Sequence, residues 1–395
     1  LNKKGDDGDG LFFLFLLIGT VLFAFITGIV NWIRFSYRIE EGELRIEYGL
    51  FVRKKRYIPF ERIQSLDFSE GILHRPFGLV KVTVETAGSG STALGEGEAV
   101  LTAIKKEEAL ALREILQNAK SKHNGSEEEI EDKREELLYQ MNGQELILLA
   151  STSGGIGVVI SGLIAFLSQF GEFIEYDELF DGVKHIIANG IIFVSVLVFL
   201  VFFIAWIASI IMTMFKYANF TLKIVEDDLV ISKGLLEKRQ ITIPLNRIQG
   251  IRISENLIRQ PFGYATVSIE SAGGAEMEGA KINLLPLIKK ERISEVIERH
   301  IGGYDLTEAF NRAPKRALRR YYFKGAAPII AAAAILVYFF EWWGLLSLLL
   351  LPFALLLAYF RFKDAGWAIG DNQLNLQYRF IVKHTMFMKK NKIQA

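Results

Sequence analysis

The densest group of residues able to bind a ligand is a run of four cations, Arg53-Lys54-Lys55-Arg56. Clustered cations beside an anionic membrane leaflet gain on the order of 1 kcal/mol each, so the run predicts contact with lipid head groups. The alternative is an edge strand whose charges prevent pairing with a foreign strand. At the corresponding place in a later repeat, residues 237–240 read Glu-Lys-Arg-Gln, so the charge is not repeated.

An isoleucine flanked by a cation and a glutamine recurs three times. The flanking residues are Arg62 and Gln64, Arg247 and Gln249, and Lys392 and Gln394. A shared surface for docking between domains, or onto a partner, would explain the repetition. A fold requirement explains it too: a buried Gln would bond loop carbonyls while the cation pairs with Glu85 or Glu270. We favour this structural interpretation, and we interpret the repeated Pro-Phe-Gly as a turn with a core aromatic.

The other polar residues give no positive case for catalysis. Cysteine is absent, which removes disulfides, thiolate metal sites and cysteine nucleophiles. The five histidines are isolated, and no hydrolase, metalloprotease or nucleotide-binding motif occurs. The formal net charge of +1 gives no indication of nucleic acid as a partner. We therefore expect a protein that is not an enzyme and that holds no metal or cofactor.

Five long apolar runs carry almost no charge. They are residues 11–33, 146–170, 186–215, 326–340 and 345–360. A helix needs about 20 apolar residues to cross the bilayer, so the runs predict five transmembrane helices, the last two forming a hairpin. Pumps and transporters usually place ionisable residues in the membrane, and these runs have essentially none. Small residues at 151–162 and 331–334 favour close helix packing instead.

The charges beside these runs predict their orientation. Arg or Lys lies beside the soluble end of each run, whereas the connection at residues 171–185 is acidic. By the positive-inside rule, the larger soluble segments are expected in the cytoplasm, with residues 1–10 and 171–185 outside. No export signal precedes the first run, so we expect a further helix upstream. We expect the sequence to be a fragment at both ends, since the third repeat stops early.

The soluble segments are copies of one another. At a constant offset of 185 positions, Gly49 matches Gly234, Pro59 matches Pro244, and the Pro-Phe-Gly motif recurs. A third copy begins at Trp367 and reaches its own cation-Ile-Gln motif before the sequence stops. In this copy Lys389 replaces the proline and Arg379 replaces the turn glycine.

Each copy alternates strands and turns before a helix. The alternation predicts strands at 35–39, 44–47, 52–58, 80–86 and 99–104 of the first copy. A helix is expected at 105–118, with Ala109, Leu112, Ile115 and Leu116 on its apolar face, and at 286–300 in the second copy. Strands followed by one helix suggest a small, partly open β-barrel capped by that helix.

Four motifs carry a resemblance to a known family. Gly-Leu-Phe/Leu, Pro-Phe/Leu-x-Arg-Ile-Gln, Pro-Phe-Gly and Glu-x-Ala-Gly resemble the bacterial pleckstrin-homology-like (PH-like) domain of the second type. Alternation of membrane hairpins with three such domains is similar to a family of membrane proteins from Gram-positive bacilli. The resemblance implies a seven-stranded barrel with a C-terminal helix. It also implies that basic residues on early strands, here Arg53 to Arg56, bind phosphorylated head groups.

The expected fold class is a membrane protein in which α-helical transmembrane hairpins alternate with small PH-like β-barrel domains. The expected order is an outside stub (1–10), a membrane helix (11–33), PH-like domain 1 (34–118), a charged helical linker (119–145), membrane helices at 146–170 and 186–215 around an acidic outside loop (171–185), PH-like domain 2 (216–301), a basic linker (302–325), a membrane hairpin (326–340 and 345–360) and the start of PH-like domain 3 (361–395).

These features favour a non-catalytic scaffold in the bacterial cell membrane that presents three cytoplasmic PH-like domains. Its expected partners are membrane lipid and either further copies of the chain or another small PH-like membrane protein. A role in cell-envelope maintenance or in tolerance of membrane-active agents is suggested by location alone. The alternatives are a lipid-handling or transport protein and a sensor of anionic lipid.

Overall fold

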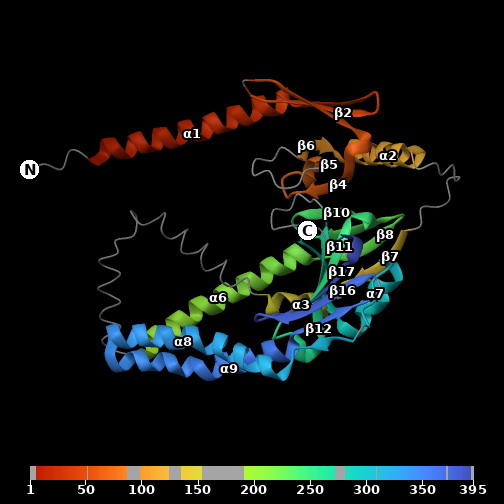
Figure 1. Cartoon of the computed structure of the whole chain (residues 1–395). Helices are drawn as coiled ribbons and strands as arrows, with labels where there is room; N and C mark the ends of the chain where they lie inside the picture. Colours follow the sequence, from red (N-terminus) through yellow and green to blue (C-terminus); the bar gives the residue numbers. More distant parts are fainter. Residues whose placement is uncertain are drawn as a thin grey trace, which may run out of the picture. The chain divides into compact units, whose positions relative to one another are not determined.

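In the computed structural model of the chain, the described residues are 6–50, 52–86, 98–123, 135–153, 191–271, 281–307, 309–370 and 372–392 (Figure 1). The chain divides into two compact units. Unit 1 comprises Leu1–Leu66 and Pro76–Ile130, and unit 2 comprises Asp67–Arg75 and Glu131–Ala395. Strand β4 (Ile63–Glu70) therefore begins in unit 1 and ends in unit 2.

Four helical spans among the described residues are long and apolar enough to cross a membrane. They lie in α1 (Asp6–Arg34), α6 (Ile191–Tyr217), α8 (Leu318–Phe340) and η7 (Glu341–Leu350) with α9 (Leu351–Asp364). At most 11% of each span's apolar window is buried, as expected of side chains that face lipid. The predicted span 146–170 and loop 171–185 fall mostly outside the described residues, which include only α3 (Gly143–Thr152) and Ser153.

Two helix boundaries differ from those predicted. Helix α1 begins at Asp6, inside the predicted stub. The second arm of the membrane hairpin becomes α-helical only at Leu351, after the 3-10 stretch η7. The chain reverses at Glu341, where φ is 48°. A Cβ on Gly344 would lie 2.3 Å from the Val337 nitrogen, so glycine is required where the arms meet.

Unit 1 contains the first repeat. An antiparallel sheet runs β1 (Ser36–Glu40), β2 (Glu43–Tyr48), β3 (Lys54–Pro59), with β3 at its edge. Strand β5 (Leu79–Thr86) pairs with β6 (Glu98–Lys105), and α2 (Lys106–His123) follows. On α2, Ala109, Leu112 and Leu116 are buried as helical spacing predicts, whereas Ile115 is 42% exposed.

The second repeat lies in unit 2. Neighbouring strands of one sheet are β7 (Glu135–Gln140), β8 (Thr221–Val225), β9 (Asp228–Lys233) and β10 (Lys238–Pro244). Neighbouring strands of another are β11 (Ile248–Glu255), β12 (Tyr264–Ser271) and β13 (Lys281–Lys289), followed by α7 (Ile293–His300). One buried cluster unites both sheets with α7, and Leu222, Ile251 and Ile297 are among its members.

Strands β7 and β13 correct two helix predictions. Strand β7 occupies the end of the linker predicted as helical at 119–145, because Tyr139 is buried and its hydroxyl donates to the Leu287 carbonyl at 2.7 Å. Strand β13 contains Pro286, the predicted start of a helix. Its apolar neighbours are fully buried, and a buried strand has the same composition as a buried helix. Pro286 is tolerated because the pairing with β12 is irregular there.

The third repeat also lies in unit 2. Its strands are β14 (Asn311–Arg312), β15 (Gly366–Ile369), β16 (Gln373–Arg379) and β17 (Lys383–Lys389). The basic linker predicted at 302–325 therefore contains a strand and the start of α8, because β14 pairs with β15. The same 3-10 turn recurs in the three repeats as η1 (Phe60–Arg62), η3 (Leu245–Arg247) and η8 (Lys390–Lys392). Each turn ends at the cation of the repeated motif.

The Pro-Phe-Gly motif is a turn, but its aromatic is not in the core. The motif lies in η2 (Arg75–Phe77) and η4 (Gln260–Phe262), and the glycines that follow have φ of 63° and 71°. Phe77 is 76% exposed and Phe262 is 64% exposed. The prediction of a core aromatic is therefore wrong, since both rings point out of the domain that carries them.

Candidate interdomain interface

Strands of successive repeats pair with each other at two places in unit 2. Residues 68–70 at the end of β4 pair antiparallel with residues 238–240 of β10, which we call the first junction. Residues 250–255 of β11 pair antiparallel with residues 383–388 of β17, which we call the second junction (Figure 1). In each case the strand after one repeat's 3-10 turn (the post-turn strand) meets the strand before the next repeat's 3-10 turn (the pre-turn strand).

Both junctions use one register. Glu70 lies opposite Lys238 in the first junction, and Glu255 lies opposite Lys383 in the second. Counted from the cation that ends each 3-10 turn, both glutamates come eight positions later and both lysines nine positions earlier. The same acid and the same base are therefore brought together twice. Opposite charges directly across a strand pair are stabilising, so the sequence itself contributes to this register.

Further hydrogen bonds reinforce the first junction. Ser69 Oγ donates to Glu237 Oε1 at 2.6 Å, and the Thr242 backbone N–H donates to Asp67 Oδ1 at 2.9 Å. Arg75 Nη1 donates to the Leu235 carbonyl at 2.6 Å. The segment 67–75 is thus held against β10 by side chains as well as by backbone.

The second junction contains a buried carboxylate between two lysines. Glu255 is 4% exposed, its Oε1 lies 3.4 Å from Lys383 Nζ, and its Oε2 is paired with Lys290 Nζ. Beside it, Ser254 Oγ and His384 Nδ1 are hydrogen-bonded at 2.9 Å. Lys290 and Glu255 belong to the second repeat and Lys383 to the third, so the carboxylate joins the two.

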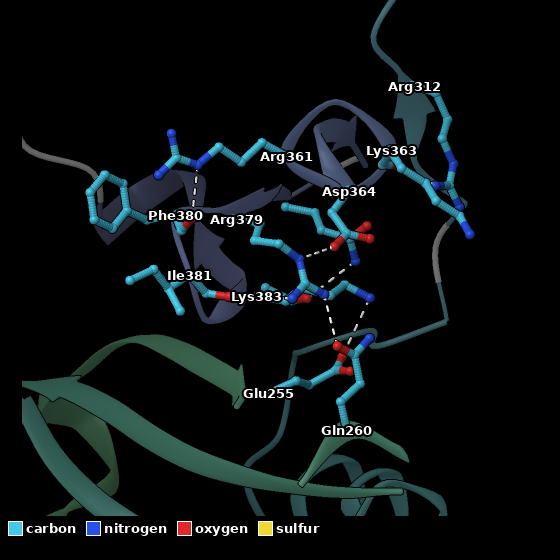
Figure 2. A network of polar contacts seen from close by, with 12 residues as sticks. Glu255, Gln260, Arg312, Arg361, Lys363, Asp364, Arg379, Phe380, Ile381 and Lys383 are labelled. Carbon is cyan, nitrogen blue, oxygen red and sulfur yellow. Dashed lines mark hydrogen bonds and ion pairs between the residues drawn. The ribbon is translucent and has the colours of Figure 1, made fainter. Parts of the chain in front are cut away.

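A buried arginine links the second junction to the membrane hairpin (Figure 2). The Arg379 side chain is 2% exposed, and its Nε is paired with Asp364 at the end of α9. Its Nη2 donates to Gln260 Oε1 at 2.9 Å and its Nη1 to the Ile381 carbonyl at 3.3 Å. One guanidinium therefore contacts a transmembrane helix, the β16–β17 hairpin and the second repeat.

Two more arginines reinforce this end of the hairpin. Arg361 Nε donates to the Phe380 carbonyl at 2.8 Å, and its guanidinium lies 4.5 Å from the Phe380 ring centroid (Figure 2). Arg312 Nη1 donates to the Lys363 carbonyl at 2.7 Å. The basic residues that flank the membrane span in the sequence are thus used to hold the third repeat at its end.

The second repeat is also connected to a predicted membrane segment. Arg259 follows β11 and is 8% exposed. Its Nε donates to Thr152 Oγ1 at 2.7 Å and its Nη2 to the Leu149 carbonyl at 3.4 Å, both on α3. Burial lowers the pKa of the Arg259 guanidinium.

The repeated motif residues lie at comparable places but are not gathered into one site. Arg62 is exposed and Gln64 half-buried in unit 1, whereas Arg247 and Gln249 are half-buried in unit 2. Lys392 Nζ donates to the Asn246 carbonyl at 3.0 Å, which connects the third repeat to the second. Gln394 lies outside the described residues.

The basic run lies on and just before the edge strand β3. Arg53, Lys54 and Lys55 are exposed, and Arg56 is half-buried beside a cavity of about 410 Å³ that Trp32 also lines. Glu47 of β2 is 3.3 Å from both Arg53 Nε and Lys55 Nζ. The hydrogen bond from Lys55, with the nearby charges, lowers the pKa of Glu47. Part of the positive charge is thus neutralised locally.

The pairing of successive repeats is the feature that the motifs did not reveal. Its signal was present, because a glutamate and a lysine stand at fixed distances from the repeated cation.

No group of three or more residues able to hold a metal occurs among the residues the structure describes.

Comparison with known proteins shows two relatives. A family model described as bacterial PH domain matches residues 8–120 and 163–301. UPF0699 transmembrane protein YdbT of Bacillus subtilis is 44% identical over 390 residues, covering 95% of this chain and 78% of that protein. UPF0699 transmembrane protein YdbS of the same bacterium is 30% identical over 100 residues, covering 25% of this chain and 58% of that protein. No solved structure matches.

Proposed function

Since the chain belongs to the bacterial PH domain family of membrane proteins, we propose that it is a non-catalytic scaffold that assembles PH-like domains in the bacterial cell membrane. The observation that carries the proposal is the strand pairing of successive repeats in one register, with Glu70 opposite Lys238 and Glu255 opposite Lys383. A contact made twice by equivalent residues is a means of adding one domain to the next.

Two further observations support the scaffold. The buried charged residues Glu255, Arg259 and Arg379 each contact a neighbouring repeat or a helix, which is a structural use of charge. The cations that flank the spans support a cytoplasmic location of the domains by the positive-inside rule. We place the scaffold in cell-envelope maintenance or tolerance of membrane-active agents. A deletion strain with unchanged growth in the presence of such agents would exclude that role.

The mass of the full-length protein tests the scaffold directly. We expect a complex of two or more chains in detergent, either of this chain alone or with a short bacterial PH domain membrane protein of the same organism. Mass photometry or light scattering in detergent and in nanodiscs would measure it. A monomer under both conditions, with and without the co-expressed short protein, would contradict the scaffold function.

Contact with the lipid surface is a second candidate, favoured by apolar loop tips in two repeats. Ile72, Leu73 and Phe77 are 57%, 80% and 76% exposed in the first repeat. Their equivalents in the second repeat are Leu257, Ile258 and Phe262, which are 42%, 57% and 64% exposed. Exposed apolar clusters mark contact surfaces. The second loop is bonded to α3, which leads into the predicted span 146–170, so lipid is the apolar phase within its reach.

Spin labelling tests the lipid contact, because a chain without cysteine accepts a label at one chosen position. A label at Phe262→Cys in nanodiscs should collide more often with oxygen than with a water-soluble nickel complex. The matched control is Lys223→Cys on β8, where the opposite preference is expected. Equal preference at the two positions would exclude insertion of the loop into lipid.

A further inference from the structure

Each paired pre-turn strand in unit 2 has two neighbours. Strand β10 lies between β9 and the end of β4, and strand β17 lies between β16 and β11. In both cases one neighbour comes from the same repeat and the other is a post-turn strand of the repeat before it. In both junctions, the pre-turn strand therefore pairs along its second edge with a strand from another repeat.

Strand β3 is the pre-turn strand of the first repeat, and no described strand lies along its second edge. Among the described residues its only strand neighbour is β2, in the sheet β1-β2-β3. Counted back nine positions from the motif cation, Arg53 corresponds to Lys238 and Lys383. The first repeat therefore carries a cation at the position that faces a glutamate in both junctions.

The side chains of β3 leave this edge accessible. The side chains of Arg53 and Lys55 remain 56% and 52% exposed despite their pairing with Glu47. Tyr57 is 54% exposed, whereas its equivalents are covered: Phe387 is 2% exposed and Thr242 is half-buried. The edge of β3 therefore resembles the edge that β10 or β17 would expose without the strand from the preceding repeat.

From this equivalence we infer that the edge of β3 binds the post-turn strand of a PH-like domain in a different protein. The strand would add antiparallel to β3 and place an acidic residue opposite Arg53, as Glu255 is placed opposite Lys383. We assign the strand to a different protein, since both post-turn strands in the described part of this chain, β4 and β11, are already paired with β10 and β17. This inference rests on the proposed scaffold function and specifies its binding surface.

Register-specific disulfide trapping tests the inference on the full-length protein. The probe is a synthetic peptide with the sequence of residues 248–255, the post-turn strand β11. Ile253 lies opposite Thr385, which corresponds to Lys55, and Ile251 lies opposite Phe387, which corresponds to Tyr57. A peptide with Ile253→Cys should therefore be trapped by the Lys55→Cys protein about tenfold more than one with Ile251→Cys, and the preference should reverse with Tyr57→Cys.

Two controls define what would overturn the inference. Arg38→Cys on β1 should trap neither peptide, and a peptide in which Glu255→Lys reverses the charge should lose most of the trapping at Lys55→Cys. Equal trapping at positions 38 and 55, or no dependence on register, would overturn it. The scaffold function would still stand if the protein nevertheless purified as a complex.

The source of the strand is tested separately in membranes. Co-expression of the Lys55→Cys protein with a second copy carrying Ile253→Cys should give no disulfide-linked dimer. A dimer formed in high yield would assign the occupant to another copy of this chain and overturn its assignment to a different protein.

Discussion

Replacing Asp364 with Ala is expected to weaken docking of the third repeat by about 3–5 kcal/mol, the cost of leaving a buried charge without its partner. The charge is Arg379, whose side chain is 2% exposed and whose Nε is paired with Asp364. The remaining acceptors, Gln260 Oε1 at 2.9 Å and the Ile381 carbonyl at 3.3 Å, are neutral. They cannot replace a carboxylate in a low-dielectric site, so the β16–β17 hairpin should separate from α9.

Docking can be measured by trapping the second junction with a disulfide. Ser254 Oγ and His384 Nδ1 are 2.9 Å apart, so a Ser254→Cys/His384→Cys protein should be oxidised readily, and Asp364→Ala should reduce the rate at least tenfold. The matched control is Lys223→Ala, which removes an exposed ion pair with Glu135 and should change little. Asp364→Leu combined with Arg379→Met should restore docking, since an apolar pair can replace a buried ion pair. Equal rates for Asp364→Ala and Lys223→Ala would show that the pair does not hold the repeat.

Arg379 also shows how far the third repeat could be predicted. Its position corresponds to the turn glycines Gly49 and Gly234, and the substitution suggested that the repeat departs from the pattern. The strands and the 3-10 turn nevertheless recur. The arginine contributes a contact to Asp364 that lies fifteen positions away along the chain. Comparing the repeats identifies the change from glycine to arginine. The contact that Arg379 makes, however, depends on where helix α9 ends.

The predicted strands were most accurate where polar and apolar residues alternate on half-buried strands, as in β2 and β5. Prediction failed where burial was complete or where the partner is distant. The apolar run around Pro286 contains no alternation, so its type could not be decided locally. Strand β7 is charged at its start and is recruited by β8, more than 80 positions later in the sequence. Its conformation is therefore set by tertiary contacts.

The junctions could have been predicted from the sequence, whereas strand β7 could not. The repeated cation indicated equivalent positions, and the acid and base that pair across the junctions recur at fixed distances from it. The missing element was β4 itself, because residues 63–70 were treated as a motif and not as a strand. Because β4 was not predicted, the edge of β10 with which it pairs had no predicted partner strand. The exposed Phe77 and Phe262 were misjudged for a related reason, since a turn motif determines the backbone but not what surrounds the ring.

Replacing Gly234 with Ala is expected to destabilise the attachment of helix α6 to the second repeat. Gly234 has φ of 105°, and a side chain there costs about 1–3 kcal/mol in backbone strain. An added Cβ would also lie 2.0 Å from the Glu237 carbonyl oxygen, so the turn into β10 must shift. The same turn is bonded to the end of α6, since the Gly234 N–H donates to the Ala218 carbonyl at 2.8 Å and the Leu235 N–H to the Phe215 carbonyl at 2.9 Å.

Hydrogen exchange and cross-linking would reveal the loss. In the Gly234→Ala protein we expect faster exchange at β9, β10 and the last turn of α6. We also expect weaker disulfide trapping between Ser69→Cys and Arg239→Cys, which lie opposite each other in the first junction. The matched control is Gly42→Ala, because Gly42 has φ of 78° but nothing within 4 Å of an added Cβ. Gly42→Ala should therefore show backbone strain alone and leave the junction intact. Equal loss of disulfide trapping between positions 69 and 239 in both variants would contradict the prediction. It would show that the clash with Glu237 does not couple the transmembrane helix to the first junction.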